Sequence, residues 1–217
     1  MTASSTTPST TPSAAPARAF VGGQRLCESP LIHVLDALLA PEECAHIIAA
    51  ARPNMRRSQV SGAGGGKFSD GRTSARAWLK HDLDPVVQAV ASRIAGCVGL
   101  PLTHAESLQV IHYEPGQEYR PHYDAYDLET EKGRRYCERG GQRLVTALAY
   151  LGEVEAGGAT GFPHLGLEIQ PRTGRVVVFH NCHPGATRCD PRTYHQGKPP
   201  LRGEKWAFNL WFHERPY

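Results

Sequence analysis

The chain has 217 residues, of which 40% are hydrophobic and 21% are charged, and its formal net charge is +3. This composition fits a globular protein and excludes collagen-like, coiled-coil and wholly disordered chains, while the mild charge gives no argument for a nucleic-acid partner. The chain contains 11 histidines, against only five lysines among its 24 basic residues. Histidine serves both as a metal ligand and as a proton carrier, so the positions of the histidines matter more than their number.

The cysteines and the chain start bear on the cellular compartment. No CxxC pair is present, and in a chain of this length scattered cysteines indicate reduced thiols rather than a disulfide framework. No apolar run approaches the roughly 18 residues of a membrane span, and the N-terminus lacks the features of a secretory signal. We therefore expect a soluble, cytoplasmic protein without a membrane partner. The six cysteines are Cys27, Cys44, Cys97, Cys137, Cys182 and Cys189.

The N-terminal segment differs from the rest of the chain. Residues 1–16 consist of Ser, Thr, Pro and Ala apart from the initial Met, and such a segment buries too little apolar surface to offset its ordering entropy. We predict a disordered tail over residues 1–20 and a single domain over 21–217. The folded part is expected to begin near Leu31, where the stretch LIHVLDALL is apolar.

Two helices are predicted in the first half of the chain. Pro41 suits a first helical position before EECAHIIAAAR, and Asp84 can cap a second helix that starts at Pro85 and continues through VVQAVASRIAGCVG. Between them, residues 61–76 are too rich in glycine for a helix or a strand. We interpret this segment as a mobile loop and as a candidate lid over a site.

Strand-like segments dominate from Ser107 onward. Helices followed by several short strands predict a sheet sandwich or barrel with helical support on one side. The charged stretch 127–139 is interpreted as a solvated loop between strands. The predicted strands cover residues 107–114, 119–124, 143–151, 175–180 and 204–213.

A histidine and an aspartate stand two positions apart in YRPHYDAY. Strand alternation would place the side chains of His122 and Asp124 on one face, within reach of a common point. This pattern alone is weak, because most copies of it bind no metal. It gains weight from the C-terminal stretch, where His195 precedes a predicted strand that contains Lys205.

That C-terminal strand has one continuous apolar face. Alternation directs Trp206, Phe208, Leu210 and Phe212 to one side, and Lys205, Ala207, Asn209 and Trp211 to the other. An inward lysine is costly unless an anion awaits it. Two imidazoles and a carboxylate form the facial triad of non-haem Fe(II) oxygenases. An inward lysine beside that triad would serve a carboxylate co-substrate.

Five segments together resemble a known family. The chain from about residue 70 to its end is similar to the 2-oxoglutarate- and Fe(II)-dependent dioxygenases, specifically to their prolyl 4-hydroxylase branch. The resemblance implies an α+β, mainly β fold, with a double-stranded β-helix (jelly roll) core over 105–217 and supporting N-terminal helices. The segments are RTSARAWL (72–79), YEPGQEYRPHYD (113–124), QRLVTALAYLGEVEAGGATGFP (142–163), GRVVVFHN (174–181) and RTYHQGKPPLRGEKWAFNLW (192–211).

The resemblance assigns roles to individual residues. The iron ligands it implies are His122, Asp124 and His195. The residues it places around the far carboxylate of 2-oxoglutarate are Lys205, as the ion-pair partner, with Tyr113 and Thr160. The residues it places beside the substrate are Tyr119, Arg143, Trp211 and His213. Tyr119 and Trp211 also suit simple packing, and Arg143 suits an ion pair at the sheet edge.

The implied reaction uses Fe(II), 2-oxoglutarate, O2 and ascorbate. It would hydroxylate an unactivated C–H bond, first of all in a prolyl residue of a peptide or protein, and release succinate and CO2. Related halogenases carry a small residue in place of the carboxylate, so the presence of Asp124 favours hydroxylation. The departures from the family at Gln196 and Pro200 leave the position of the target proline open.

Three alternatives remain at this stage. The substrate could be a free amino acid or another small molecule, or the barrel could have kept its metal and lost catalysis. A zinc-binding interaction module built from Cys182, His183, Cys189 and His195 belongs to a different class, although the spacing of its cysteines departs from structural zinc sites. The sequence does not define the oligomeric state.

Overall fold

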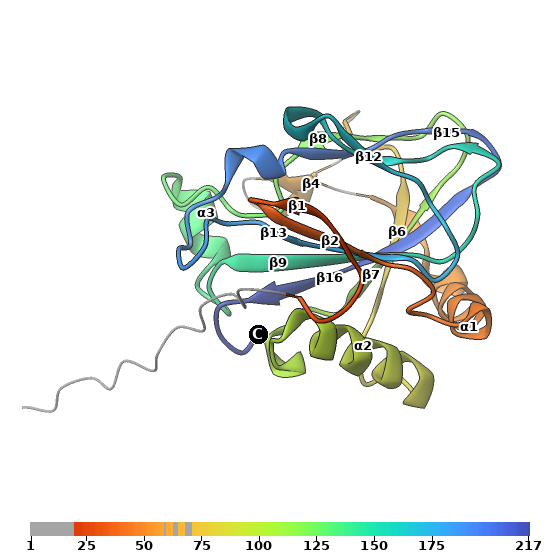
Figure 1. The fold of residues 1–217 in the computed structure, drawn as a ribbon, viewed down its shortest axis with the longest axis horizontal. Helices are drawn as coiled ribbons and strands as arrows, with labels where there is room; N and C mark the ends of the chain where they lie inside the picture. The colour runs from red at the N-terminus through yellow and green to blue at the C-terminus, as the bar shows by residue number, and fades with distance from the viewer. Residues whose placement is uncertain (1–19, 59, 63–64, 68–70) are drawn as a thin grey trace, which may run out of the picture.

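The computed structural model describes residues 20–58, 60–62, 65–67 and 71–217, which form two facing antiparallel sheets with helices outside one of them (Figure 1). The larger sheet runs in the order β1 (Gln24–Glu28), β2 (Leu31–Leu35), β13 (Val176–His180), β9 (Arg143–Tyr150), β16 (Lys205–His213), β7 (Leu108–Tyr113), β6 (Ala75–Leu79) and β3 (Arg56–Arg57). The smaller sheet runs in the order β12 (Leu167–Ile169), β11 (Thr160–Phe162), β14 (His195–Gly197) and β8 (Tyr119–His122).

The remaining elements flank these sheets. Two further strand pairs are β10 (Ala156–Gly157) with β15 (Pro200–Arg202), and β4 (Val60–Gly62) with β5 (Gly65–Lys67). The helices are α1 (Pro41–Ala51), α2 (Pro85–Val98) and α3 (Glu131–Tyr136), with short 3-10 turns at Arg52–Asn54, Leu102–His104, Pro163–Leu165 and Pro191–Thr193. Among the described residues, no helix is long and apolar enough to cross a membrane.

The larger sheet is covered on both faces. Residues of α1 and α2 pack with one face of the sheet into a first hydrophobic cluster, and the other face packs with the smaller sheet into a second cluster. Figure 1 shows α1 and α2 on one side of β9 and β16, and β8 and β12 on the opposite side. This is the predicted jelly-roll core with supporting helices, so the predicted fold class is confirmed.

The two faces of β16 follow the predicted alternation. The apolar set Trp206, Phe208, Leu210 and Phe212 lies in the cluster shared with the helices. Ala207 lies in the cluster between the sheets, and the Lys205 side chain is buried on that same interior side. The strand is central in its sheet, which explains why eight of its nine residues are buried.

Helix α2 begins and ends as its sequence predicts. The Asp84 carboxylate accepts hydrogen bonds from the backbone N–H groups of Val86 and Val87 at 2.9 and 3.0 Å, which satisfies donors that the helix itself cannot pair. Gly99 follows the helix with a φ of 75°, the left-handed conformation that glycine adopts without strain.

The fold begins earlier than predicted. Residues 1–19 of the predicted tail lie outside the described residues, but Phe20 is buried, with its ring 5.5 Å from that of His33 and 4.9 Å from that of His180. Strand β1 also precedes Leu31, so the expectation that the folded part begins near Leu31 is wrong. The polar sequence of β1 hides the strand, because β1 forms an exposed edge of the sheet.

Two predicted loops contain regular structure. In the Gly-rich segment 61–76, Val60–Gly62 pairs with Gly65–Lys67 and β6 begins at Ala75, so the prediction of a loop there is wrong in part. The backbones of these two short strands pair as a hairpin. Residues 63–64 and 68–70 of the candidate lid lie outside the described residues. The charged stretch 127–139 contains α3, whose N-terminus is capped by the Thr130 hydroxyl, which accepts from the Gly133 N–H.

Removing the cap of α2 should weaken the whole fold, since α2 covers the larger sheet. We expect Asp84→Ala to lower the free energy of unfolding by about 1 kcal/mol, and Asp84→Asn, which keeps an acceptor oxygen, to lower it by clearly less. Urea denaturation of the three proteins measures both values. Equal losses in the two variants would show that the carboxylate acts through its contact with His46 and not through the cap.

Candidate active site

Two histidines meet where β8 and β14 pair. In the register of these strands His195 lies directly opposite His122, and their ring centroids are 4.3 Å apart. Residues far apart in the chain thus present their imidazoles side by side at the interior of the smaller sheet. The pairing depends on strand register, so its geometry follows from the fold.

Asp124 completes the cluster from outside the strand. β8 ends at His122, so the predicted strand over 119–124 is too long and alternation is not what aims the carboxylate. Its Oδ1 lies 3.6 Å from Nε2 of His122, and its Oδ2 lies 3.6 Å from Nε2 of His195. The candidate ligand atoms of the three residues all lie within 4.8 Å of one another.

Backbone carbonyl groups orient both imidazoles. Nδ1 of His122 donates to the Arg120 carbonyl and Nδ1 of His195 donates to the Thr193 carbonyl, each at 2.9 Å. A carbonyl only accepts, so Nδ1 of each ring carries a proton, and Nε2 is the nitrogen that faces Asp124. Such outer hydrogen bonds commonly fix metal-binding histidines.

Two polar side chains of the larger sheet hold the Asp124 carboxylate. The Thr146 hydroxyl donates to Oδ2 of Asp124 at 2.8 Å, and the side-chain amide of Asn181 donates to the Thr146 hydroxyl at 2.9 Å. All three residues are buried. Thr146 and Asn181 lie within segments that carry the family resemblance, but nothing in their residue type marked them as functional.

The electrostatics of the cluster suit a divalent cation. Burial disfavours an ionised Asp124, but His195 and His122 beside it hold the pKa of its carboxyl far below the usual range. Burial, reinforced by His122, lowers the pKa of His195 to about 4. The cluster therefore presents a carboxylate and two imidazole nitrogens, which is the donor set of non-haem Fe(II) sites, and the residues fit that metal.

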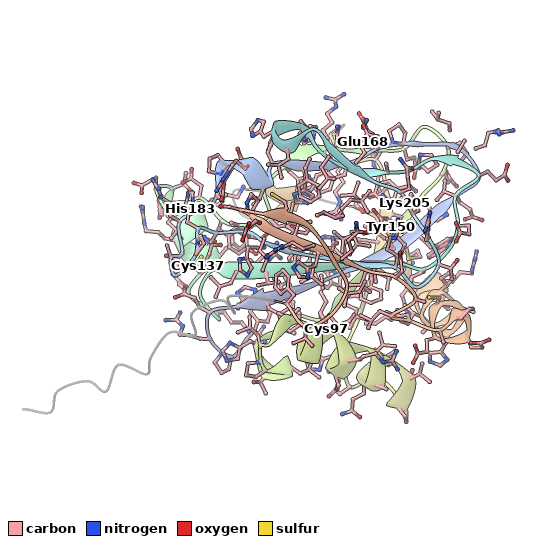
Figure 2. The ribbon with its side chains drawn as sticks, in the orientation of Figure 1. Cys97, Cys137, Tyr150, Glu168, His183 and Lys205 are labelled. Atoms are coloured by element: carbon pink, nitrogen blue, oxygen red, sulfur yellow. The ribbon has the colours of Figure 1, made fainter. Side chains whose placement is uncertain are left out.

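Lys205 lies in the same interior. It stands opposite Tyr113 in the β16–β7 register, and its ammonium lies 5.3 Å and 5.4 Å from the ring centres of Tyr113 and Tyr150. Figure 2 labels Lys205 and Tyr150 close to each other. Among the described residues no carboxylate pairs with it, although its side chain is only 1% exposed. Burial lowers the pKa of Lys205 to about 7. A buried, unpaired ammonium is a site for an anion.

Hydroxyl groups surround this position. Tyr113 is buried and lies across from Lys205. Thr160 is buried and accepts a hydrogen bond from the Tyr150 hydroxyl at 2.7 Å, and Tyr150 also donates to the Ile169 carbonyl. Thr160 and Tyr113 were predicted to belong to this region, whereas Tyr150 was not, because it reads as one more apolar residue of β9.

A cavity of about 1070 Å³ opens beside the histidine cluster. Three of the four residues predicted to border a substrate, Tyr119, Arg143 and Trp211, line this cavity together with Asp124. Tyr119 stacks on His122 with ring centroids 3.6 Å apart, and the Arg143 guanidinium lies 3.8 Å from the Trp211 ring centre. Tyr119 and Trp211 therefore pack against neighbouring side chains, as expected, and also line the cavity.

His213 lies behind the wall of this cavity and does not line it. Its side chain is fully buried between two acceptors, with Nδ1 2.9 Å from the Gly141 carbonyl and Nε2 2.8 Å from Oε1 of Glu106. Nε of Arg143 donates to the same Glu106 oxygen at 2.6 Å. His213 thus positions Glu106, which holds Arg143 at the wall, and Arg143 does form the ion pair that the sequence left open.

The four residues of the alternative zinc module do not form a metal-binding cluster among the described residues. Cys182 and Cys189 face each other across an isolated bridge, and His183 contacts Asp190. Within the part of the chain that the structure describes, the one group of three possible metal ligands is His122, Asp124 and His195. His195 therefore belongs to that group and not to a zinc module with the cysteines.

Comparisons with known proteins agree with this geometry. The family described as the 2OG-Fe(II) oxygenase superfamily matches residues 108–213. Prolyl 4-hydroxylase 5 of Arabidopsis thaliana is 36% identical over 205 residues, which cover 85% of this chain and 68% of the relative.

Two solved structures share the fold. A viral collagen prolyl hydroxylase from Paramecium Bursaria Chlorella virus-1, crystallised with 2OG, is 27% identical with a TM-score of 0.61, over 86% of this chain and 97% of the other. A Pseudomonas putida prolyl-4-hydroxylase is 19% identical with a TM-score of 0.56, over 84% of this chain and 92% of the other.

The chain belongs to the 2OG-Fe(II) oxygenase superfamily and, within it, to the prolyl 4-hydroxylase branch. Its cofactor is Fe(II) and its co-substrate is 2-oxoglutarate, as the resemblance implied. The oxygenase therefore replaces the zinc-binding interaction module as the interpretation of this chain.

The buried ammonium of Lys205 should destabilise the protein in the absence of its anion. The pKa of this lysine is lowered from 10.5 to about 7, so between these values unfolding takes up a proton and stability rises with pH. Without 2-oxoglutarate, we expect the free energy of unfolding of the wild type to rise relative to Lys205→Met by about 1.4 kcal/mol per pH unit, from about pH 7 to about pH 9.

Urea denaturation across that pH range measures the difference between the two proteins. Taking the difference cancels the tyrosines and cysteines that titrate near the upper end of the range. Parallel pH curves for wild type and Lys205→Met would contradict the burial of a charged lysine.

Proposed function

We propose that the protein hydroxylates prolyl residues in a peptide or protein, converting 2-oxoglutarate and O2 to succinate and CO2 in the process. The observation that carries this proposal is the position of Asp124, which belongs to the histidine cluster and also lines the large cavity. The relatives named as prolyl 4-hydroxylases and the structure named as a collagen prolyl hydroxylase support the choice of proline.

The metal would be held by Nε2 of His122, Nε2 of His195 and the carboxylate of Asp124. When bound, Fe(II) supplies the oxidation of an unactivated C–H bond coupled to decarboxylation of 2-oxoglutarate. The chain contributes donor orientation, through the carbonyls of Arg120 and Thr193 and the hydroxyl of Thr146. Three protein ligands leave positions for the co-substrate and oxygen.

The far carboxylate of 2-oxoglutarate would pair with Lys205. The two partners offset each other's desolvation in an interior where the lysine has no other anion among the described residues. Tyr113 and Thr160 offer hydroxyl groups in the same region. The apolar side chains between the two sheets exclude water from this end of the molecule.

The size of the cavity favours a peptide over a free amino acid. Its volume of about 1070 Å³ lies at the upper end of the range of about 300–1,000 Å³ that accommodates drug-sized ligands, and a single amino acid would fill only part of it. Tyr119 and Trp211 contribute aromatic side chains to the wall beside which a proline ring would lie, and Arg143 offers donors to a peptide carbonyl.

The proposal is tested with purified protein, Fe(II), 2-oxoglutarate and ascorbate. We expect succinate release to increase with proline-containing peptides, with one oxygen added to proline by mass spectrometry, and His122→Ala to lose this turnover by at least about a hundredfold. Stimulation by free amino acids but by no peptide would overturn the peptidyl substrate. Absence of iron-dependent turnover with any substrate would overturn the oxygenase activity and favour a barrel without catalysis.

The hydroxyl of Thr146 should matter for metal binding although it is not a ligand. We expect Thr146→Val to weaken Fe(II) affinity by about 10-fold to 100-fold, because the Asp124 carboxylate loses the donor that orients it. Thr146→Ser keeps the hydroxyl and is the matched control, with affinity near that of the wild type. Anaerobic titration with Fe(II) measures the affinities, and equal affinities for the Val and Ser variants would contradict the role.

A further inference from the structure

The wall of the large cavity carries more positive charge than its acidic residues neutralise. Of the three acidic residues on the wall, Glu106 is bonded to Arg143 and Asp124 belongs to the metal cluster, which leaves Asp127. The cationic residues on the wall are Arg72, Arg76, Lys132, Arg139 and Arg143. A divalent cation bound by the cluster of His122, Asp124 and His195 would add further positive charge beside this wall.

Arg76 is one of the cationic residues on this wall. It lies on β6 opposite Ile111, a residue of the cluster between the sheets, so its side chain leaves the interior face of the sheet. The guanidinium lies 5.8 Å from the ring centre of Trp78, another residue of the cavity wall. Among the described residues no carboxylate pairs with Arg76.

In the described part of the chain, its neighbour Arg72 also has no carboxylate partner. Arg72 is 5% exposed, and its Nη2 donates to the neutral side chain of Gln109 at 2.7 Å. Its Nε is buried and has no hydrogen-bond partner within the described part of the chain. A buried donor without a partner costs free energy that an acceptor oxygen of a ligand would recover.

A third arginine lies beside Arg76 in the sheet, outside the residues that line the cavity. Arg56 on β3 lies directly opposite Arg76 on β6, and like charges in directly opposed positions destabilise a sheet. The pKa of Arg76 is lowered by burial and by the charge of Arg72, in agreement with a crowded positive site.

Several arginines elsewhere in the chain are paired with acids. Arg93 bonds to both oxygens of Glu43, Arg175 to Asp36, and Arg192 to Asp190. On the cavity wall Arg143 is paired with Glu106, whereas the buried Arg72 and the half-buried Arg76 have no acid among the described residues. The contrast indicates that the acid which completes them arrives with the substrate.

We propose that Arg76, beside Arg72 and Arg56, selects prolyl substrates that carry acidic residues next to the target proline. A guanidinium matches a carboxylate through two parallel hydrogen bonds, a match that an amide or a hydroxyl does not reproduce. The inference rests on the proposed function, because the acidic side chains belong to the peptide that the cavity binds. Arg76 is thus a specificity-determining residue.

The test compares two peptides of equal length with one central proline, flanked either by glutamates or by the matched glutamines. We expect kcat/KM for the glutamate peptide to be about tenfold higher with the wild-type holoenzyme, and the ratio to shrink as salt is raised. Arg76→Gln should bring the ratio close to one, chiefly through KM. Arg76→Glu should reverse the preference when a lysine-flanked peptide is added.

The matched control is Arg25→Gln. Arg25 is an exposed arginine of β1, at the opposite edge of the same sheet from β3 and β6. This variant should keep the tenfold preference of the wild type. Circular dichroism and the urea midpoint verify that all variants are folded, since Arg76 is only half-buried.

A second measurement separates the inference from the proposed function. Fluorescence anisotropy of labelled peptides, on the protein loaded with Fe(II) and 2-oxoglutarate without oxygen, reports binding in the absence of turnover. Tighter binding of the glutamate peptide without oxygen transfer to proline would overturn the proposed function and support the charge selection. Hydroxylation of both peptides with equal kcat/KM, or an equal loss for both in Arg76→Gln, would overturn the charge selection alone.

Discussion

The alternation of side chains along β16 constrains the whole molecule. Its apolar set packs under the helices while Lys205 and Trp211 point between the sheets, and the strand hydrogen-bonds to β7 and β9 on either side. The shared register places Lys205 opposite Tyr113 and Trp211 opposite Thr146. A slip of one residue would turn every one of these side chains to the other face, so the hydrophobic packing under the helices also fixes the chemistry between the sheets.

The interior between the sheets holds several charged groups, and they fall into two kinds. Glu106 is provided with donors by the chain, from Arg143 and His213, whereas Asp124 accepts from Thr146 through one oxygen and keeps the other beside His122 in the metal cluster. Lys205 has no counter-ion among the described residues, and the same holds for Arg72 and Arg76. Groups that the fold completes itself serve as scaffolding. Groups that it leaves incomplete mark where ligands bind.

The sequence predicted the parts of the site whose residue types are unusual for their position. A lysine in an apolar strand and the HxD pair pointed to Lys205, His122 and Asp124, and the N-cap of α2 followed from Asp84. Thr146 could not be singled out, because a threonine in the run RLVTALAYL is an ordinary residue of a buried strand. Its contact with Asp124 is known only once the two segments are placed in three dimensions. The end of β8 at His122 was missed for a related reason: alternation describes a strand but not where hydrogen bonding stops.

The direct opposition of His195 and His122 on β14 and β8 joins two parts of the chain that are distant in sequence. Contacts of this kind form late in folding, because a long loop must close before they stabilise anything. An ion that binds only after both strands have paired binds the folded state and not the unfolded state, so it stabilises the fold by mass action. The supply of iron would then govern how long each molecule escapes unfolding and proteolysis, as well as how fast it turns over.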